Sequence, residues 1–237
     1  MDCKEANNKL VKYGQQHVLE IATRLGCAND AELIKQIEQT DFEVIELGKN
    51  AAKETKRGII TPIEVMSIDE IASKEQEYRE VGIRAIRDGK VGAVLLAGGM
   101  GTRLGSDMPK GVYNIGITRD VYIFECLVNN LKAVVDETGA YIHLFVMTSE
   151  KNNDVTVDFF REHNCFGYPA EYIHFFMQEM APATDYDGKV LMEAANRIAT
   201  SPNGNGGWYS SIISAGLHTV IEKEGVEWLN VFAVDNV

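Results

Sequence analysis

From Val91 to the end of the chain, continuous apolar runs of strand length alternate with stretches of helical length. The runs expected to form strands are 91–97 (VGAVLLA), 142–147 (IHLFVM), 171–176 (EYIHFF) and 229–234 (LNVFAV). Helices are expected between them at 121–136, 153–163 and 207–223. Apolar strands separated by helices are typical of a mostly parallel sheet that is covered on both faces. The pattern predicts an α/β, Rossmann-like domain over residues 91–237.

The first ninety residues are expected to form a helical N-terminal arm. Residues 31–39 and 42–48 carry charge at nearly every position that is not apolar, as short amphipathic helices do. Three residue pairs have the spacing of a helix capping box: Asn29 with Glu32, Thr40 with Glu43, and Ser67 with Glu70. The sequence therefore suggests two parts, the helical residues 1–90 and the sheet domain of residues 91–237.

Composition excludes several classes of partner. The 35 acidic and 23 basic residues give a net charge of -12, which disfavours the broad basic surface of a nucleic-acid-binding protein. No apolar run reaches the length of about 18 residues that a membrane span needs, and the N-terminal segment is polar, so a cytoplasmic protein is expected. The four cysteines are scattered, without zinc-site spacing. An anionic ligand would have to be bound locally.

The loop after the first strand has the composition of such a local site. Residues 96–105 read LAGGMGTRLG, and residues 109–111 read PKG. The glycines let a ligand approach the backbone without meeting a Cβ atom, and amides freed in this way can bind phosphate. Arg103 and Lys110 add positive charge. The loop follows the carboxyl end of a strand, where parallel sheets bind their ligands.

Two common phosphate-binding loops do not fit this segment. A P-loop requires a glycine-lysine pair followed by Ser or Thr, and the chain has none. A dinucleotide-binding fingerprint requires a third glycine at the position that Leu104 occupies. The loop therefore belongs to neither class.

The segment resembles the signature of the eukaryotic-type UDP-sugar pyrophosphorylases, and specifically of the UDP-N-acetylglucosamine pyrophosphorylase family. Three further motifs of that family follow in order: FFMQ at 175–178 with PA and DGK after it, PNGNGG at 202–207, and VDN at 234–236. The resemblance implies a nucleotidyltransferase that joins UTP to N-acetylglucosamine 1-phosphate, forming UDP-N-acetylglucosamine and pyrophosphate. Family members continue well beyond the VDN motif, so the chain is expected to be truncated at its C-terminus. The acetamido pocket would then lie outside this sequence, and the fragment alone could be inactive.

The resemblance also implies a role for each part of the glycine loop. The backbone of Leu96, Ala97, Gly98 and Gly99 would hold the uridine. The turn formed by Gly101, Thr102 and Arg103 would surround the β- and γ-phosphates. As catalytic groups, Lys110 would lie against the α-phosphate and Arg103 would stabilise the departing pyrophosphate.

The later motifs supply the remaining contacts that the resemblance implies. Gln178 would hydrogen-bond the edge of the uracil, although family members often have a second Gln where this chain has Met177. In the motif that starts at Pro202, Gly204 would lie against the base and Asn205 would reach toward the sugar nucleotide. Asp235 would ligate Mg²⁺, the expected cofactor.

Two alternatives remain open from the sequence. One is a pyrophosphorylase for UDP-glucose or a broader range of UDP-sugars, against which the glycine loop and the PKG motif favour the N-acetylglucosamine branch. The other is a catalytically silent nucleotide-binding protein of the same fold, which the joint presence of Arg103, Lys110 and Asp235 disfavours. In either case the expected partners are small molecules.

Overall fold

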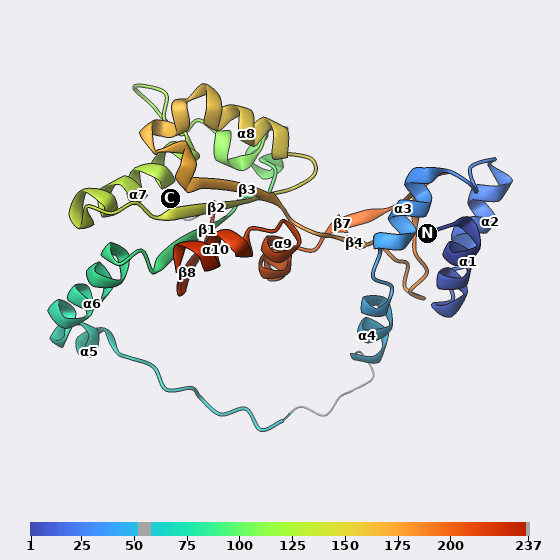
Figure 1. Cartoon of the computed structure of the whole chain (residues 1–237), viewed down its shortest axis with the longest axis horizontal. Helices are drawn as coiled ribbons and strands as arrows, with labels where there is room; N and C mark the ends of the chain where they lie inside the picture. The colour runs from blue at the N-terminus through green and yellow to red at the C-terminus, as the bar shows by residue number, and fades with distance from the viewer. Residues whose placement is uncertain (52–57, 236–237) are drawn as a thin grey trace. The chain divides into compact units, whose positions relative to one another are not determined.

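The computed structural model describes residues 1–51 and 58–235, including their side chains except those of residues 49–51 and Arg103 (Figure 1). The chain divides into two compact units by its internal contacts. The helical unit comprises Met1–Ile63 and Met180–Asn203, and the sheet unit comprises Glu64–Glu179 and Gly204–Val237. This division differs from the boundary after residue 90 that the sequence suggested.

The sheet unit is built on four parallel strands in the order β3-β2-β1-β8. Their bounds are Val91–Leu96 for β1, His143–Thr148 for β2, Ile173–Met177 for β3 and Trp228–Ala233 for β8. The predicted parallel sheet is therefore confirmed, and each strand lies within two residues of its expected position. Because all four strands run in the same direction, their carboxyl ends share one edge.

Helices cover both faces of this sheet (Figure 1). On one face, α7 (Ile123–Thr138) and α8 (Asn153–Glu162) pack Phe124 and Phe160 against Leu95 and its neighbours. On the other, α9 (Trp208–Ser214) and α10 (His218–Glu224) pack against residues such as Val94. The single helix expected at 207–223 is two helices, since the chain turns at Gly216, whose φ is 74°.

The helices α5 (Ile68–Ser73) and α6 (Glu75–Arg87) also belong to the sheet unit. The Arg87 side chain donates a hydrogen bond of 3.0 Å to the backbone oxygen of Thr138, which ties the end of α6 to the end of α7. Two short 3₁₀ turns, η3 (Asn164–Gly167) and η4 (Ala170–Tyr172), connect α8 to β3. Ile86 also packs against the core of the sheet unit, so the end of α6 connects residues 64–90 to the sheet.

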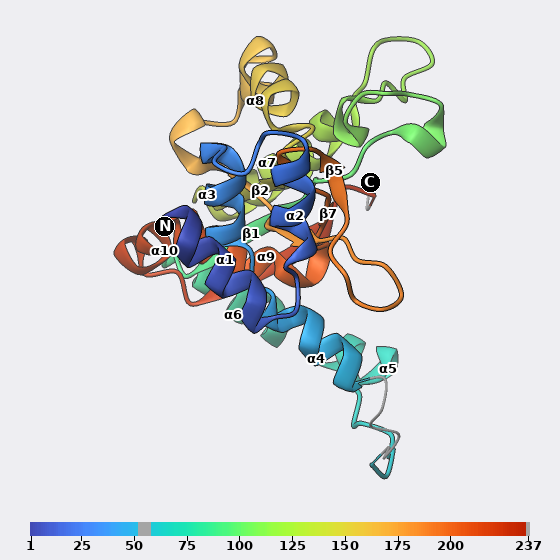
Figure 2. The same cartoon turned by 90° about the vertical axis from the view of Figure 1, so that its right-hand side faces the viewer.

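In its described residues, the helical unit combines four helices with two antiparallel ribbons. The helices are α1 (Cys3–Lys12), α2 (His17–Arg24), α3 (Ala31–Gln39) and α4 (Glu43–Ala51); the ribbons pair β4 (Met180–Pro182) with β7 (Thr200–Pro202), and β5 (Met192–Ala194) with β6 (Arg197–Ile198) (Figure 2). Leu10, Leu33 and Ile37 bury their side chains in one cluster with Val190 and Ile198. The sequence predicted the helices but not the ribbons that complete their core.

The structure confirms one of the three expected capping pairs and corrects the other two. Ser67 caps α5 as expected, because its hydroxyl accepts the Glu70 amide. The residue that caps α3 is Asp30 rather than Asn29, and Thr40 instead ends α3 by donating to the backbone oxygen of Gln36. Neighbouring Asp, Asn and Thr residues compete for the same cap position, so spacing alone did not select among them.

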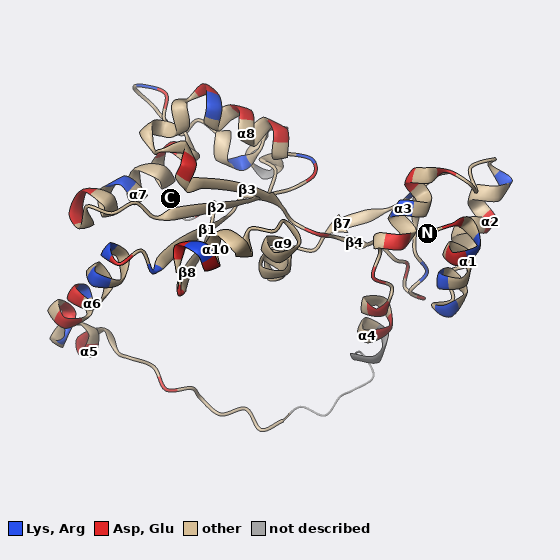
Figure 3. Ribbon diagram, in the orientation of Figure 1, with Lys and Arg blue, Asp and Glu red and all other residues tan. Residues whose placement is uncertain are grey.

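Charged residues of both signs alternate along the helices, as Figure 3 shows for α1 and α6. Among the described residues, no helix is both long enough and apolar enough to cross a bilayer. The distribution is that of ordinary solvated helix faces.

Candidate functional site

The carboxyl ends of the four strands bring the predicted site segments to one edge of the sheet. The loop after β1 is fixed to the ends of both neighbouring strands: the Ala97 amide donates to the Met147 oxygen at 2.8 Å, and the Leu96 oxygen accepts from Val234 at 3.1 Å. Residue Gln178 continues β3 by donating to Thr148 at 2.8 Å. The segments after β1, β3 and β8 therefore begin side by side, as the sequence predicted.

The glycine loop folds back on itself before it reaches α7. The Gly101 amide donates to the Met108 oxygen at 2.8 Å, and the Lys110 amide donates to the Gly99 oxygen at 3.2 Å. Between these bonds, η1 (Thr102–Leu104) forms the tip of the loop. The fold-back places the backbone of Lys110 directly beside Gly99, which brings together the two halves of the predicted motif.

The glycine of the PKG motif has a packing role. Gly111, in η2 (Lys110–Val112), is buried, and the Phe124 ring occupies the space that a Cβ atom would need. This contact holds the end of the loop against α7. Glycine is required here by the core, whatever the ligand.

Three consecutive amides in the loop are free to bind a ligand. Within the described residues, the backbone N–H groups of Gly98, Gly99 and Met100 have no hydrogen-bond acceptor. A Cβ atom at Gly98 would overlap the side-chain amide of Gln178, whereas one at Gly99 would meet nothing within 4 Å. A side chain at position 98 would therefore displace the Gln178 amide, whereas any steric requirement at position 99 would come from a ligand.

Gln178 presents an unused amide beside this loop. The residue is only 7% exposed, yet in the part of the chain that the structure describes its side-chain nitrogen and oxygen have no hydrogen-bond partner. Neither atom is among the fully enclosed side-chain atoms that lack a partner, so the amide keeps a face that a ligand can reach. An amide offers a donor and an acceptor together, which suits the polar edge of a nucleobase.

The second glycine turn is held next to Gln178. Gly204 has φ 76° and ψ -169°, a conformation that essentially only glycine adopts, and η5 (Asn205–Gly207) follows it. The buried hydroxyl of Ser211 accepts the Glu179 amide at 3.0 Å and donates to the Gly207 oxygen at 2.8 Å. The turn is thus tied to the residue that follows Gln178. Pro202 is part of β7 in the helical unit.

Lys110 and Asp235 form an ion pair at the same edge of the sheet. The Lys110 ammonium donates to one carboxylate oxygen of Asp235, and the Asp235 side chain is 59% exposed. The predicted cation and the predicted metal ligand are therefore in contact. The second carboxylate oxygen is open to bind a cation, as the expected magnesium site requires.

In the described part of the chain, a cluster of acidic, histidine or cysteine side chains does not complete the metal site around Asp235. No group of three or more His, Cys, Asp and Glu residues among those described is arranged to hold a metal ion. Magnesium is commonly bound by one or two carboxylates together with phosphate oxygens and water. The Asp235 carboxylate fits a magnesium ion that arrives with a nucleotide.

The predicted role of Arg103 stays a prediction. Its backbone is part of η1, inside the folded loop, but its side chain lies outside what the structure describes. The same holds for Asn236 of the VDN motif, which is not among the described residues.

Two residues that hold the site were not anticipated from the sequence. Asn152, after β2, donates from its side chain to the Ala97 oxygen at 3.0 Å, and Ser211 fixes the second glycine turn. Both are common polar residues in segments without a motif. Only the tertiary contacts identify them.

Two histidines make a close contact at the opposite end of the strands. His143 begins β2, and its Nδ1 lies 3.0 Å from Nε2 of His174. Burial lowers the pKa of both rings, and the neighbouring His143 lowers the pKa of His174 further. The pair belongs to the sheet unit and lies away from the candidate site.

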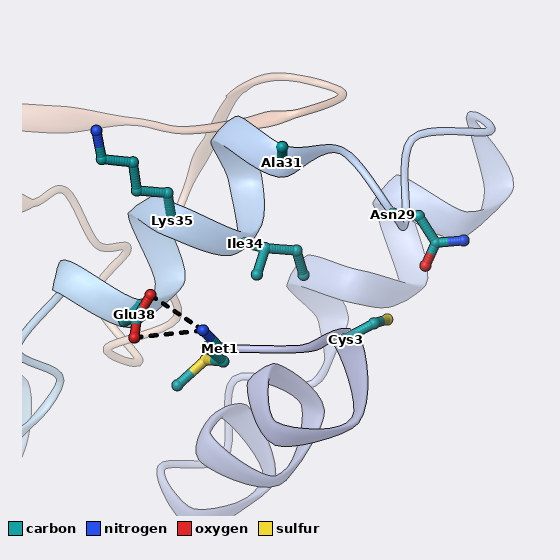
Figure 4. Close-up of a pocket in the computed structure, with 7 residues that line it drawn as sticks. All are labelled: Met1, Cys3, Asn29, Ala31, Ile34, Lys35 and Glu38. Atoms are coloured by element: carbon teal, nitrogen blue, oxygen red, sulfur yellow. Dashed lines mark hydrogen bonds and ion pairs between the residues drawn. The ribbon is translucent and has the colours of Figure 1, made fainter.

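A surface hollow in the helical unit contains none of the predicted site residues (Figure 4). Its lining comprises Met1, Cys3, Asn29, Ala31, Ile34, Lys35 and Glu38. The N-terminal ammonium pairs with the Glu38 carboxylate at 3.3 Å, so its charge is already compensated. The hollow therefore lacks the converging free groups found at the edge of the sheet.

A family model described as UTP-glucose-1-phosphate uridylyltransferase matches residues 12–237. The probable UDP-N-acetylglucosamine pyrophosphorylase of Schizosaccharomyces pombe is 31% identical over 98% of this chain and 51% of that protein. The UDP-N-acetylglucosamine pyrophosphorylase of Saccharomyces cerevisiae is 32% identical, over 96% and 52% respectively. The chain thus spans about half the length of the curated relatives it matches.

Solved structures of UDP-sugar enzymes also match this chain. The crystal structure of the uridine diphosphate N-acetylglucosamine pyrophosphorylase from Trypanosoma brucei in complex with inhibitor matches with a TM-score of 0.76 and 27% identity. That match covers 100% of this chain and 52% of the other. A UDP-glucose phosphorylase from Trypanosoma brucei matches with a TM-score of 0.60 and 18% identity, over 86% of this chain and 44% of the other, and shows a shared fold.

Proposed function

The chain belongs to the UTP-glucose-1-phosphate uridylyltransferase family, and on that basis we propose that it carries the nucleotide-binding half of an enzyme that makes a UDP-sugar. The proposed reaction joins UTP to N-acetylglucosamine 1-phosphate and releases pyrophosphate. The observation that supports it most strongly is the convergence at one edge of the sheet: free amides at 98–100, the unused Gln178 amide, and the Lys110–Asp235 pair.

Each of these groups has a place in binding UTP. The Gln178 amide would read the uracil edge, with Gly204 and Asn205 in the turn tied next to it. The amides of the glycine loop would hold the ribose and phosphates. Lys110 would neutralise the α-phosphate, where charge develops during transfer, and Arg103 would stabilise the pyrophosphate.

The proposed chemistry needs positioning and charge neutralisation more than proton transfer. A sugar 1-phosphate is already ionised at neutral pH, so no general base has to activate it. Bound Mg²⁺ would supply Lewis-acid stabilisation of the phosphates, and Asp235 is the described residue that would hold it. The chain's own contribution is to align two anions that otherwise repel each other.

The relatives favour the acetamido sugar over glucose. The similar curated proteins of the two yeasts are both described as UDP-N-acetylglucosamine pyrophosphorylases, at 31% and 32% identity. The UDP-glucose enzyme from Trypanosoma brucei is less similar, at 18%. We therefore propose N-acetylglucosamine 1-phosphate as the sugar substrate, with glucose 1-phosphate as the competing candidate.

The proposed setting is a cytoplasmic one with small-molecule partners. All four cysteines are free thiols, as is usual in a reducing compartment. The net charge of -12 disfavours nucleic acid as a partner.

Pyrophosphate release by the complete protein tests the proposal. The assay supplies UTP with either N-acetylglucosamine 1-phosphate or glucose 1-phosphate, with Mg²⁺ or with excess EDTA. We expect Mg²⁺-dependent release that is faster with the acetamido sugar. A preference for glucose 1-phosphate would make glucose 1-phosphate the sugar substrate. UTP binding without release of pyrophosphate would indicate a nucleotide-binding protein that lacks the proposed catalytic activity.

A further inference from the structure

Asn152 stands at the start of α8 but does not cap that helix. An asparagine at this position usually accepts hydrogen bonds from the first free amides of its own helix. The Asn152 side chain makes no such bond. It reaches across to the glycine loop after β1 instead, so its contacts serve a different segment of the chain.

The Asn152 side chain forms hydrogen bonds with backbone atoms through both its donor and its acceptor. Its nitrogen donates to the oxygens of Ala97, at 3.0 Å, and Gly99, at 3.4 Å. Its oxygen accepts the Ser149 amide at 2.7 Å. The residue is 0% exposed, which strengthens these bonds and makes their loss costly.

These bonds set the direction of the free amides in the loop. In a trans peptide the C=O and N–H groups point in opposite directions, and the described residues contain no cis bond. Asn152 holds the Ala97 oxygen toward itself, and it shares the Gly99 oxygen with the Lys110 amide, which donates to it at 3.2 Å. The N–H groups in the same two peptide planes, those of Gly98 and Met100, must therefore point away from Asn152.

We propose that Asn152 is a positioning residue, which latches the glycine loop so that the amides of Gly98 and Met100 face an anionic nucleotide. The inference rests on the proposed function for the identity of the ligand. The latch itself depends only on the contacts with Ala97 and Gly99. Asn152 need not touch the ligand, because it acts through the peptide planes that it holds.

Two substitutions separate this role from a general effect on folding. Asn152→Ala removes the latch, and UTP affinity should fall about tenfold at every pH. Asn152→Asp is isosteric, but its ionised form repels the two carbonyl oxygens, whereas its protonated form can donate to one of them. Its UTP affinity should be low at pH 8.5 and recover partly by pH 5.5.

The matched control is Asn129→Asp, which makes the same change on an exposed position of α7. Calorimetric titration with UTP measures affinity, and hydrogen exchange measures local opening. We expect faster exchange in the Asn152 variants at residues 97–101, with β1 residues 93–95 as protected as in the control. Unchanged UTP affinity in Asn152→Ala, or faster exchange spread evenly over the sheet, would overturn the inference.

The same data separate failure of the inference from failure of the proposed function. If the unmodified protein binds no UTP, the proposed function fails. In that case, hydrogen exchange by itself tests whether Asn152 holds the loop. Opening confined to residues 97–101 in Asn152→Ala would support it, and unchanged exchange there would refute it.

Discussion

The two units contain buried glutamines that are used in opposite ways. In the helical unit, the Gln15 side chain donates to the Gly188 oxygen and accepts the Val190 amide, both at 2.9 Å. In the sheet unit, the Gln178 amide forms no hydrogen bond with the described part of the chain, although it too is buried. The two residues are 1% and 7% exposed, but the Gln178 amide atoms are not fully enclosed.

We interpret the difference as one between a side chain that serves the fold and a side chain that is available to a ligand. Gln15, like Gln36, pairs with both backbone groups of a distant segment in the way a neighbouring strand would. Its bonds fasten the ribbons to the helices. Gln178 lies instead against Gly98, among free loop amides. The predictions that follow test whether the sheet edge serves binding and the helical unit serves stability.

The largest expected effect is on catalysis. Lys110→Met should lower turnover of UTP by at least about a hundredfold, because the α-phosphate loses about 3 kcal/mol of pre-organised stabilisation. The matched control is Lys90→Met, since Lys90 pairs with Glu227 at 2.7 Å just before β1 and β8 begin. Initial rates of pyrophosphate release measure both. Equal losses of turnover in the two variants would show that a lysine at the carboxyl edge of the sheet contributes no more to catalysis than a lysine at the opposite edge.

Stability should respond to Gln15 and not to Gln178. Gln15→Leu leaves the Gly188 oxygen and the Val190 amide without partners, so the free energy of unfolding should fall by about 2 kcal/mol. Gln178→Leu leaves no protein group unpaired and should be neutral or slightly stabilising. Denaturant unfolding measures both, with Gln39→Leu on an exposed position of α3 as the control. Equal destabilisation by the two buried substitutions would contradict the comparison.

UTP binding should respond to Gln178 and not to Gln15. Gln178→Leu should weaken UTP binding by about tenfold, the value of one lost hydrogen-bonded contact, and reduce the preference for UTP over CTP. Gln15→Leu should leave both quantities unchanged while the protein is folded. Calorimetric titration with each nucleotide measures them. A Gln178→Leu variant that still prefers UTP would show that another group reads the base.

A smaller effect of pH is expected from the histidine pair. The pKa of His143 and of His174 is lowered by burial, so at mildly acidic pH the unfolded chain binds more protons than the folded one. Their contribution to stability is complete above the unfolded value of about 6.5 and is lost as pH falls below it. The thermal midpoint should drop between pH 7.5 and 5.5.

A variant with both histidines changed to Gln isolates this effect. Neither side chain then titrates, so the variant should lose less of its thermal midpoint between the same two pH values. If its dependence on pH matched that of the unmodified protein, other groups would be responsible.

Much of the fold followed from the sequence because its signals are local. The strand from Val91 and the helix at 31–39 were placed to within a residue or two, since apolar periodicity dictates which face is buried. The ribbons at 180–202 were not predicted. Their strands have two or three residues each, and the helix side chains that bind them, those of Gln15 and Gln36, lie 162 to 175 positions away along the chain.

The candidate site was predictable in part for a related reason. Gly98, Lys110, Gln178 and Asp235 stand in motifs, and the structure brings them to one edge of the sheet. Asn152 stands in no motif, and its role depends on a hydrogen bond to residue 97. A contact between segments 55 residues apart leaves no local pattern for the sequence to show.

The most direct measurement is a titration of UTP with Mg²⁺ into isotope-labelled protein, followed by NMR. The account predicts that the backbone amides of residues 98–100 and the side-chain amide of Gln178 shift together and saturate at one affinity, while the side-chain amides of Gln15 and Gln36 stay unchanged. A silent Gln178, or shifts centred on the helical unit, would contradict it.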